Sequence, residues 1–227
     1  MSFDIILQAR YSSKRLPGKI LLNLGSSSVI EYLIKNLKKI KIIRYIILAV
    51  PNDTYQKVFK YIAKYNFVKF YVSQDKKDSN VLKRFYDCSN QFGCENVIRI
   101  TPDCPFINNK MVEIMVNYFQ NNNLNFLVNN FPRKIPHGFD CEIFSSDLLK
   151  RTHKKAKSFY DREHVTSWMY KNAFKNINYI EFFNKNYSNL RLTLDYAEDY
   201  LFFIKNFNKL KQLPLSKKPE VILDKII

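Results

Sequence analysis

The chain has 227 residues, enough for one domain with a sizeable core, and its 46% hydrophobic and 15% aromatic content excludes a disordered protein. No apolar stretch approaches the roughly 20 residues of a membrane helix, so we predict a cytoplasmic protein without membrane association. The formal net charge of +17 raises nucleic acid as a partner, but Lys residues are spread along the whole chain, which favours a solvated basic surface.

Short apolar runs alternate with amphipathic stretches in the first half of the chain, which is typical of βα units around a mostly parallel sheet. The predicted strands are Phe3–Ala9, Tyr45–Val50, Val68–Val72 and Val97–Thr101. The predicted helices are Ser28–Ile40, Thr54–Tyr65 and Ser79–Phe92. The pattern predicts an α/β fold.

The second half begins in the same way and then becomes less regular. A helix at Asn109–Gln120 and a strand at Phe126–Asn129 precede a proline-containing loop at Asn130–Gly138. Phe139–Phe144 alternates like a strand near an edge or in a mixed sheet. The remaining predicted elements are helices at Asp147–His153, Arg162–Asn172 and Tyr196–Leu210, and strands at Ile177–Phe183 and Leu190–Thr193. We expect one domain over residues 1–227.

The connection after the first strand carries several cations, namely Arg10, Lys14, Arg15 and Lys19. Ligands of open α/β sheets bind beyond the carboxyl ends of the strands, so this loop is placed to hold a polyphosphate. It is not a Walker loop, because the G-x-x-x-x-G-K-[ST] pattern is absent. Gly18 permits an unusual backbone angle or close approach to a ligand. An ordinary basic turn is the alternative.

Several blocks along the chain together resemble the cytidylyltransferases, which include the acylneuraminate and 3-deoxy-manno-octulosonate enzymes, and most of all the spore-coat polysaccharide biosynthesis branch. The blocks are Gln8–Arg10, Arg15–Lys19, Arg99–Pro105, His137–Glu142, Arg162–Thr166 and Leu190–Asp195. They occur in the family's order and span most of the chain. The chain departs from the family at Tyr11–Ser12 and at Pro102, where glycine is common.

The resemblance implies a three-layer αβα nucleotidyltransferase fold, Rossmann-like and of the nucleotide-diphospho-sugar transferase type, with a mixed, mostly parallel sheet. It implies transfer of CMP from CTP to an acidic sugar or a sugar or polyol phosphate, for surface polysaccharides such as capsule or lipopolysaccharide. Residues 1–129 would form the CTP-binding half. The implied nucleotide-binding residues are Gln8, Ala9, Arg10, Arg15, Gly18, Lys19, Thr101 and Asp103. Lys19, Arg15 and Asp103 are the expected catalytic residues.

Two aspartates are candidates for a magnesium site. Asp103 follows the predicted strand Val97–Thr101, and Asp195 follows Leu190–Thr193. Carboxylates at strand ends can hold Mg²⁺ between phosphate oxygens. Taken singly, Asp103 is equally well a turn residue and Asp195 a helix N-cap.

The second half, residues 130–227, would bind the acceptor and form the interface of a homodimer like those common among related enzymes. The candidate acceptor-binding residues are His137, Asp140, Glu142, His164 and Arg191. His164 is equally well a partly buried structural histidine. The residues leave open whether the nucleophile is a sugar hydroxyl or a phosphate oxygen.

Two other classes of protein remain as alternatives. A glycosyltransferase of related fold would use a nucleotide sugar, and such enzymes usually carry a D-x-D motif, which does not follow any predicted strand here. A basic nucleic-acid-binding module is less favoured, because the chain has neither zinc-finger spacing nor an RNP-like aromatic run.

Overall fold

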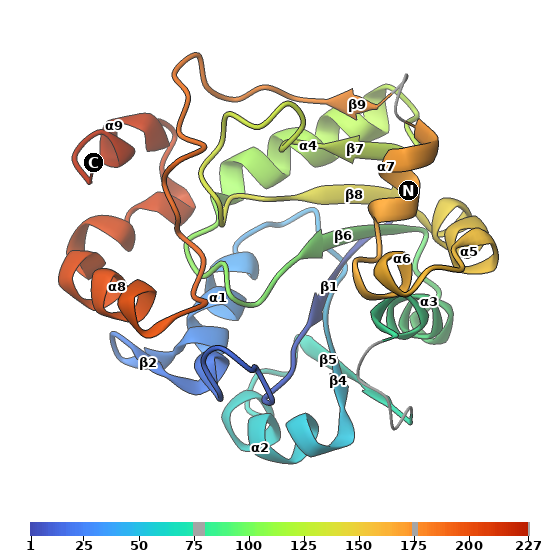
Figure 1. Ribbon diagram of the computed structural model, residues 1–227, viewed down its shortest axis with the longest axis horizontal. Coiled ribbons are helices and arrows are strands. Elements are labelled where there is room, and N and C mark those ends of the chain that lie inside the picture. The colour runs from blue at the N-terminus through green and yellow to red at the C-terminus, as the bar shows by residue number, and fades with distance from the viewer. Residues whose placement is uncertain (75–79, 174–176, 227) are drawn as a thin grey trace.

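The computed structural model describes residues 1–74, 80–173 and 177–226 (Figure 1). Its main sheet, within these residues, has the strand order β5-β4-β1-β6-β8-β7-β9. The strands are β1 (Phe3–Gln8), β4 (Tyr45–Pro51), β5 (Val68–Ser73), β6 (Asn96–Ile100), β7 (Phe126–Val128), β8 (Glu142–Ser145) and β9 (Asn178–Tyr179). Neighbouring strands are parallel except at β8, which runs antiparallel to β6 and β7. The predicted mixed, mostly parallel sheet is confirmed.

The parallel register brings the carboxyl ends of the first strands to one edge of the sheet. Leu7 near the end of β1 lies beside Leu48 of β4 and Ile100 at the end of β6. The antiparallel β8 begins at the same edge, because Glu142 pairs with Arg99 of β6. Loops after β1 and β6 therefore meet the start of β8.

Helices cover both faces of the sheet. They are α1 (Val29–Leu37), α2 (Asn52–Ile62), α3 (Val81–Phe92), α4 (Asn109–Asn121), α5 (Ser146–Lys155), α6 (Phe159–Glu163), α7 (Ser167–Ala173), α8 (Ala197–Leu210) and α9 (Pro219–Leu223). On one face α1, α2 and α4 bury apolar side chains against Ile5 and Leu7, and on the other α3, α5 and α7 pack around Ile6. This alternation along β1 is the period of two expected for a strand between two helical layers. The three-layer αβα fold is confirmed.

A third apolar core joins the C-terminal helices to the rest of the molecule. Phe203 of α8 packs edge-on against Phe106, with ring centroids 5.0 Å apart. The hairpin β2 (Asn23–Leu24) and β3 (Ser27–Ser28), which the sequence analysis did not predict, also contributes Leu24 to this core. Short 3₁₀ turns at Lys19–Leu21 and Leu213–Leu215 complete the described elements. None of the helices in the described part of the chain has the length and apolar character that crossing a bilayer requires.

The predicted strand Phe139–Phe144 is wrong in its first half, because β8 begins only at Glu142. The side-chain amide of Asn129 donates to the Phe139 carbonyl at 2.8 Å and accepts from the Cys141 amide at 2.9 Å. A side chain thus satisfies backbone groups that a strand ladder would otherwise pair.

The single helix predicted over Arg162–Asn172 is also wrong, since the structure has two helices, α6 and α7, separated by a turn. Val165 has a φ of 53°, a left-handed conformation that interrupts the helix and is unfavourable for a β-branched residue. Asp161 accepts hydrogen bonds from Ser158 and Ser167 on either side of this break. We call residues 164–166 the α6–α7 turn.

Two other predicted strands are much shorter than expected. The segment Ile177–Phe183 pairs as β9 over Asn178–Tyr179, because its partner β7 has three residues. Leu190–Thr193 forms a single bridge, between Arg191 and His137. The predicted start of the third helix at Ser79 lies outside the described residues.

Candidate active site

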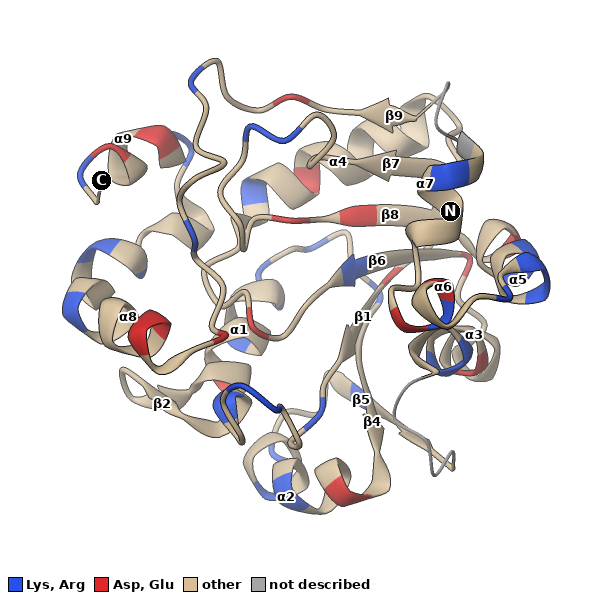
Figure 2. Ribbon diagram, in the orientation of Figure 1, with Lys and Arg blue, Asp and Glu red and all other residues tan. Residues whose placement is uncertain are grey.

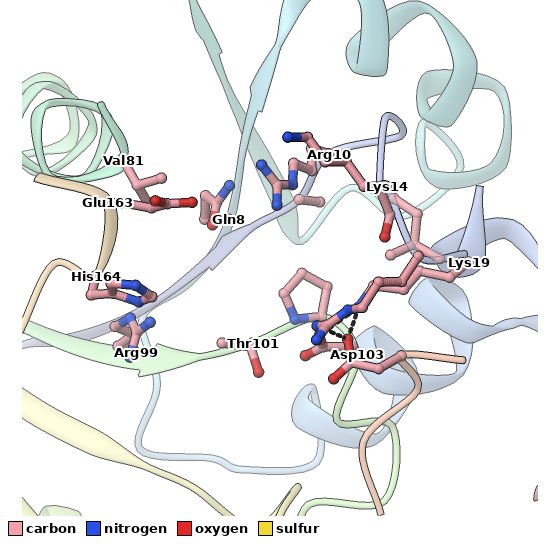
Figure 3. Close-up of a pocket in the computed structure, with 16 residues that line it drawn as sticks. Gln8, Arg10, Lys14, Lys19, Val81, Arg99, Thr101, Asp103, Glu163 and His164 are labelled. Carbon is pink, nitrogen blue, oxygen red and sulfur yellow. Dashed lines mark hydrogen bonds and ion pairs between the residues drawn. The ribbon is translucent and has the colours of Figure 1, made fainter. Parts of the chain in front are cut away.

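A cavity of about 470 Å³ opens at the carboxyl edge of the sheet. Most of its polar lining comes from β1 and the loop after it, from β6 and the residues that follow, and from the end of α6 (Figure 3). The lining residues are Gln8, Ala9, Arg10, Ser13, Lys14, Arg15, Lys19, Ile20, Val81, Arg99, Thr101, Pro102, Asp103, Glu163, His164 and Asp195. Figure 3 shows Arg10, Lys14 and Lys19 toward one end, and Val81, Glu163 and His164 at the other.

The loop of residues 9–19, which we call the basic loop, is fastened to helix α2 through Tyr11. The Tyr11 amide donates to Thr54 Oγ1 at 2.9 Å, and the Lys57 ammonium lies 3.7 Å from the centre of the Tyr11 ring. Gly18 returns the chain, with a φ of 69° and a hydrogen bond from its amide to the Tyr11 carbonyl at 2.9 Å. The conformation is left-handed, which glycine adopts without steric cost. The loop cations are thereby held beside the cavity.

Lys19 lies at the centre of an ion-pair cluster that joins distant parts of the sequence. Its Nζ donates to Asp103 Oδ2 at 2.7 Å and to Asp195 Oδ1 at 2.9 Å. Arg15 reaches the same Asp195 oxygen at 2.6 Å. The Leu194 amide donates to the Asp103 carbonyl at 2.8 Å, which brings the two aspartates together. The three catalytic candidates and the second metal candidate therefore form one cluster.

Charge pairing keeps the central groups of this cluster ionised. Burial by itself would lower the pKa of Lys19, but the Asp103 carboxylate and hydrogen bonds to both aspartates outweigh it and raise that pKa. Burial would raise the pKa of Asp103, but the Lys19 ammonium and further hydrogen bonds, including one with Thr101, together outweigh it and lower that pKa. At neutral pH the cluster presents a cation between carboxylates.

The donor set of this cluster fits Mg²⁺ held together with phosphates. Mg²⁺ prefers oxygen ligands and commonly takes one or two carboxylates, leaving the rest of its shell to phosphate and water. Asp103 and Asp195 supply two carboxylates that converge on one point, at Lys19 Nζ. Among residues 1–74, 80–173 and 177–226, no group of three or more His, Cys, Asp or Glu side chains is arranged to hold a metal.

The structure brings most of the predicted nucleotide-binding residues to the cavity. Gln8, Ala9, Arg10, Arg15, Lys19, Thr101 and Asp103 line it. Gly18 shapes the basic loop without lining the cavity. The Thr101 hydroxyl lies 3.0 Å from Cys104 Sγ, in the turn that carries Asp103.

The predicted acceptor-binding residues are not brought together in the same way. His164 lines the cavity, whereas His137, Asp140, Glu142 and Arg191 are not among its lining residues. The Asp140 carboxylate accepts from Arg133, from Asn130 at 2.9 Å and from the Gly138 amide at 3.2 Å. Arg191 pairs with Asp199 at 2.8 Å. The acceptor-binding role of these residues stays a prediction.

Glu142 holds a cavity residue that the sequence analysis did not select. Arg99 lines the cavity, and its Nη1 donates to Glu142 Oε2 at 2.6 Å. Thr166 Oγ1 and Tyr170 Oη also donate to Glu142, at 3.1 and 2.9 Å. Burial would lower the pKa of Arg99, but Glu142, together with Tyr170 and Asp140, outweighs it, so the net shift is upward. Glu142 therefore holds the Arg99 side chain in place at the cavity.

The period of two of strand side chains, continued one residue beyond β6, would have identified Arg99. Thr101 lies two residues after Arg99 and lines the same cavity. Glu163 also lines the cavity and directly precedes His164. Val81, at the start of α3, has no chemical signal in the sequence that marks it as part of a site. Its position follows from the packing of α3 on the sheet.

The remaining cations are distributed around the molecule. Figure 2 shows Lys and Arg on α2, α5 and α8, which lie on different sides of the sheet. The basic loop is different because its cations adjoin a cavity that also holds Asp103 and Asp195. A small polyanion that coordinates a cation fits this combination of charges.

Comparison with known proteins gives a consistent result. A family model described as "Cytidylyltransferase" matches residues 5–222. An uncharacterized protein of Methanocaldococcus jannaschii is 32% identical over 204 residues, covering 88% of this chain and 80% of that protein. The spore coat polysaccharide biosynthesis protein SpsF of Bacillus subtilis is 26% identical over 205 residues, covering 86% and 82%. A solved cytidylyltransferase from Leptospira borgpetersenii superposes with a TM-score of 0.85 at 28% identity, covering 100% of this chain and 94% of that one.

Proposed function

This chain belongs to the cytidylyltransferase family, and we propose that it transfers CMP from CTP to an acidic sugar or to a sugar or polyol phosphate, releasing pyrophosphate. As a CTP-dependent nucleotidyltransferase it acts on a sugar or phosphate acceptor. That the acceptor is an acidic sugar or a sugar or polyol phosphate is our proposal. A role in surface polysaccharide synthesis is supported by the name of the Bacillus subtilis relative.

The observation that carries the proposal is the cluster of Lys19, Asp103 and Asp195 beside the basic loop. CTP is a polyanion, and attack on its α-phosphorus requires that the charge developing on the leaving pyrophosphate be neutralised. Lys19 and Arg15 are suited to oxygens of the β- and γ-phosphates, and Arg10 adds a further cation at the same cavity. These side chains orient the triphosphate and stabilise the leaving group.

Asp103 and Asp195 would hold Mg²⁺, the cofactor that we propose. When bound, Mg²⁺ neutralises phosphate oxygens and helps to align the triphosphate for in-line attack. In the free protein the carboxylates also keep Lys19 charged through their hydrogen bonds to it. A cationic Lys19 is what the leaving-group role requires.

The end of the cavity formed by Arg99, Glu163 and His164 is the proposed position of the acceptor group that attacks CTP. Arg99 is suited to a carboxylate or phosphate oxygen, because guanidinium groups make charge-assisted hydrogen bonds with such anions. Glu142 limits the motion of Arg99 and so favours a single binding geometry. This arrangement supports an anionic acceptor.

A pyrophosphate-release screen tests the proposal. CTP is offered with Mg²⁺ to a panel of acidic sugars, sugar phosphates and polyol phosphates, with ATP, GTP and UTP as nucleotide controls. We expect release with CTP and one acceptor class, and loss of that release in Asp103→Asn. Turnover of a nucleotide sugar without pyrophosphate release would instead assign the chain to glycosyl transfer.

A further inference from the structure

The Lys19 ammonium occupies the position between the two carboxylates that we propose as ligands of the divalent cation. Its Nζ is 2.7 Å from Asp103 Oδ2 and 2.9 Å from Asp195 Oδ1. The three side chains are 13%, 22% and 15% exposed, so solvent weakens these ion pairs less than it weakens surface pairs. A metal ion that bridged the same two oxygens would have to displace this ammonium.

The backbone segments that carry the two carboxylates are held in place by contacts that do not involve Lys19. The Leu194 amide donates to the Asp103 carbonyl at 2.8 Å, which joins the two segments. The Asp195 amide donates to Asp199 Oδ2 at 2.8 Å, at the start of α8. Without Lys19 the carboxylates would therefore still face each other, and their mutual repulsion would favour a divalent cation between them.

Lys19 is also well placed to leave this position. Its ammonium lies at the end of a flexible four-carbon chain, beside the cations of the basic loop where we place the triphosphate. Phosphate oxygens would offer the ammonium new acceptors at the moment when a metal ion arrives with them. The same side chain can then serve the carboxylates first and the phosphates second.

We propose that Lys19 is an internal counter-ion that occupies the divalent-cation position in the free protein and moves onto the phosphates when metal and CTP bind together. This inference rests on the proposed CMP transfer. It predicts that the enzyme binds the divalent cation weakly when no nucleotide is present. Arg15 contributes less to this effect, because its side chain is 53% exposed and contacts Asp195 alone of the two carboxylates.

Binding of Mn²⁺ to the nucleotide-free full-length chain, measured by electron paramagnetic resonance, tests the inference. The variants are Lys19→Met and Lys19→Gln, which remove the charge, and Lys19→Arg, which retains it. Lys205→Met is the matched control, because Lys205 is an exposed lysine of α8. The double variant Lys19→Met/Asp103→Asn identifies the site. Circular dichroism establishes that each variant is folded.

We expect weak Mn²⁺ binding in the wild type, Lys19→Arg and Lys205→Met, and at least tenfold tighter binding in Lys19→Met and Lys19→Gln. The gain should disappear in Lys19→Met/Asp103→Asn. Unchanged affinity in both neutral variants would overturn the inference, as would a gain that persists without the Asp103 charge. Since the titration contains neither CTP nor acceptor, its outcome is separate from that of the pyrophosphate screen.

Discussion

The basic-loop end of the cavity differs from residues 130–173 and 177–191, which we call the wall and of which Glu163 and His164 line the cavity. The two regions differ in how well the position of a residue in the sequence predicts the position of its side chain. At the first end, residues from the loop after β1, from the end of β6 and from Asp195 meet in one ion-pair cluster. In the wall, Asp140 and Glu142 are engaged by other protein side chains, and His164 alone of the five acceptor-binding candidates lines the cavity.

The difference follows from the local architecture. Parallel strands joined by helices bring their carboxyl ends to one edge, so polar residues after such strands converge. The wall instead combines an antiparallel strand, a proline-containing loop and the α6–α7 turn, where side-chain hydrogen bonds set the path of the chain. In the wall, a residue that lies close to a strand end in the sequence therefore need not line the cavity.

The largest expected effect is at the basic-loop end. Lys19→Met should lower the rate of pyrophosphate release about 10²–10³-fold, or roughly 2.7–4 kcal/mol, because a charge-assisted contact to the leaving group is lost. Lys205→Met is the matched control and should leave the rate near that of the wild type. Rates at saturating CTP, with an acceptor found in the screen, measure the effect. A Lys19→Met rate within a few-fold of wild type would mean that the basic-loop end is no more important for catalysis than the wall.

In the wall we expect the main effect on stability. Glu142→Gln should lower the free energy of unfolding by about 3 kcal/mol, because the partly buried Arg99 loses its counter-ion. Asp140→Asn should cost less, since the Asp140 side chain is 28% exposed. Urea unfolding of both variants measures this. If Glu142→Gln kept full stability and raised only the KM for the acceptor, Glu142 would be an acceptor-binding residue.

The glycines Gly18 and Gly138 give a matched pair across the two regions. A Cβ on Gly138, where φ is 105°, would lie 2.4 Å from the Leu192 carbonyl oxygen, so Gly138→Ala should cost about 2 kcal/mol of stability. A Cβ on Gly18 would lie 3.1 Å from the Tyr11 ring, and its φ of 69° also disfavours alanine. Gly18→Ala should therefore cost about 1 kcal/mol of stability, less than Gly138→Ala, while its affinity for CTP falls.

Thermal unfolding and CTP titration of the two variants separate these outcomes. Equal losses of stability in both would show that the basic loop is as rigidly built as the wall. A Gly138→Ala protein as stable as wild type would show that the segment containing Leu192 can move.

The sequence predicted the first half of the fold well because its signals are local. Hydrophobic periods of two and of 3.6 residues located β1, β4, β5, β6, α1 and α2, and also α4 at the start of the second half, with differences at their ends. The hairpin β2–β3 was missed because two-residue strands have no measurable period; Gly25, with a φ of 64°, lies in its turn. In the second half, the amide of Asn129 delays the start of β8, and the left-handed Val165 divides a helix that the pattern predicts as continuous.

The candidate site was predictable to a similar extent. Residues that follow parallel strands were placed correctly beside one another, as with Lys19 and Asp103. Asp195 joined them although the predicted strand before it is a single bridge, because the Leu194 amide binds the Asp103 carbonyl. The ion pair between Arg99 and Glu142 depends on the antiparallel pairing of β8, which one sequence does not specify.

The smallest expected effect concerns Asp161, which holds the α6–α7 turn of the wall together. Its carboxylate accepts hydrogen bonds from Ser158 at 2.7 Å, Ser167 at 2.7 Å and Lys171 at 2.8 Å. Burial would raise the pKa of Asp161, but these bonds outweigh it and lower the pKa to about 2. Because the pKa is depressed on folding, Asp161 stabilises the protein fully above its unfolded pKa, which is near 4. That contribution is lost as the pH falls from about 4 to about 2.

We therefore expect Asp161→Asn to reduce the free energy of unfolding by about 1 kcal/mol at pH 7, with the difference from wild type shrinking below pH 4. Urea unfolding of both proteins at pH 7, 5 and 3 measures this, and other carboxylates such as Glu31 titrate in both proteins and cancel. Asp147→Asn, at an exposed position in the first turn of α5, is the control. A difference that stayed constant down to pH 3 would mean that the size and shape of Asp161, rather than its charge, hold the turn. The wall would then owe its geometry to packing, as the helical layers do, and its contrast with the charged basic-loop end would be sharper.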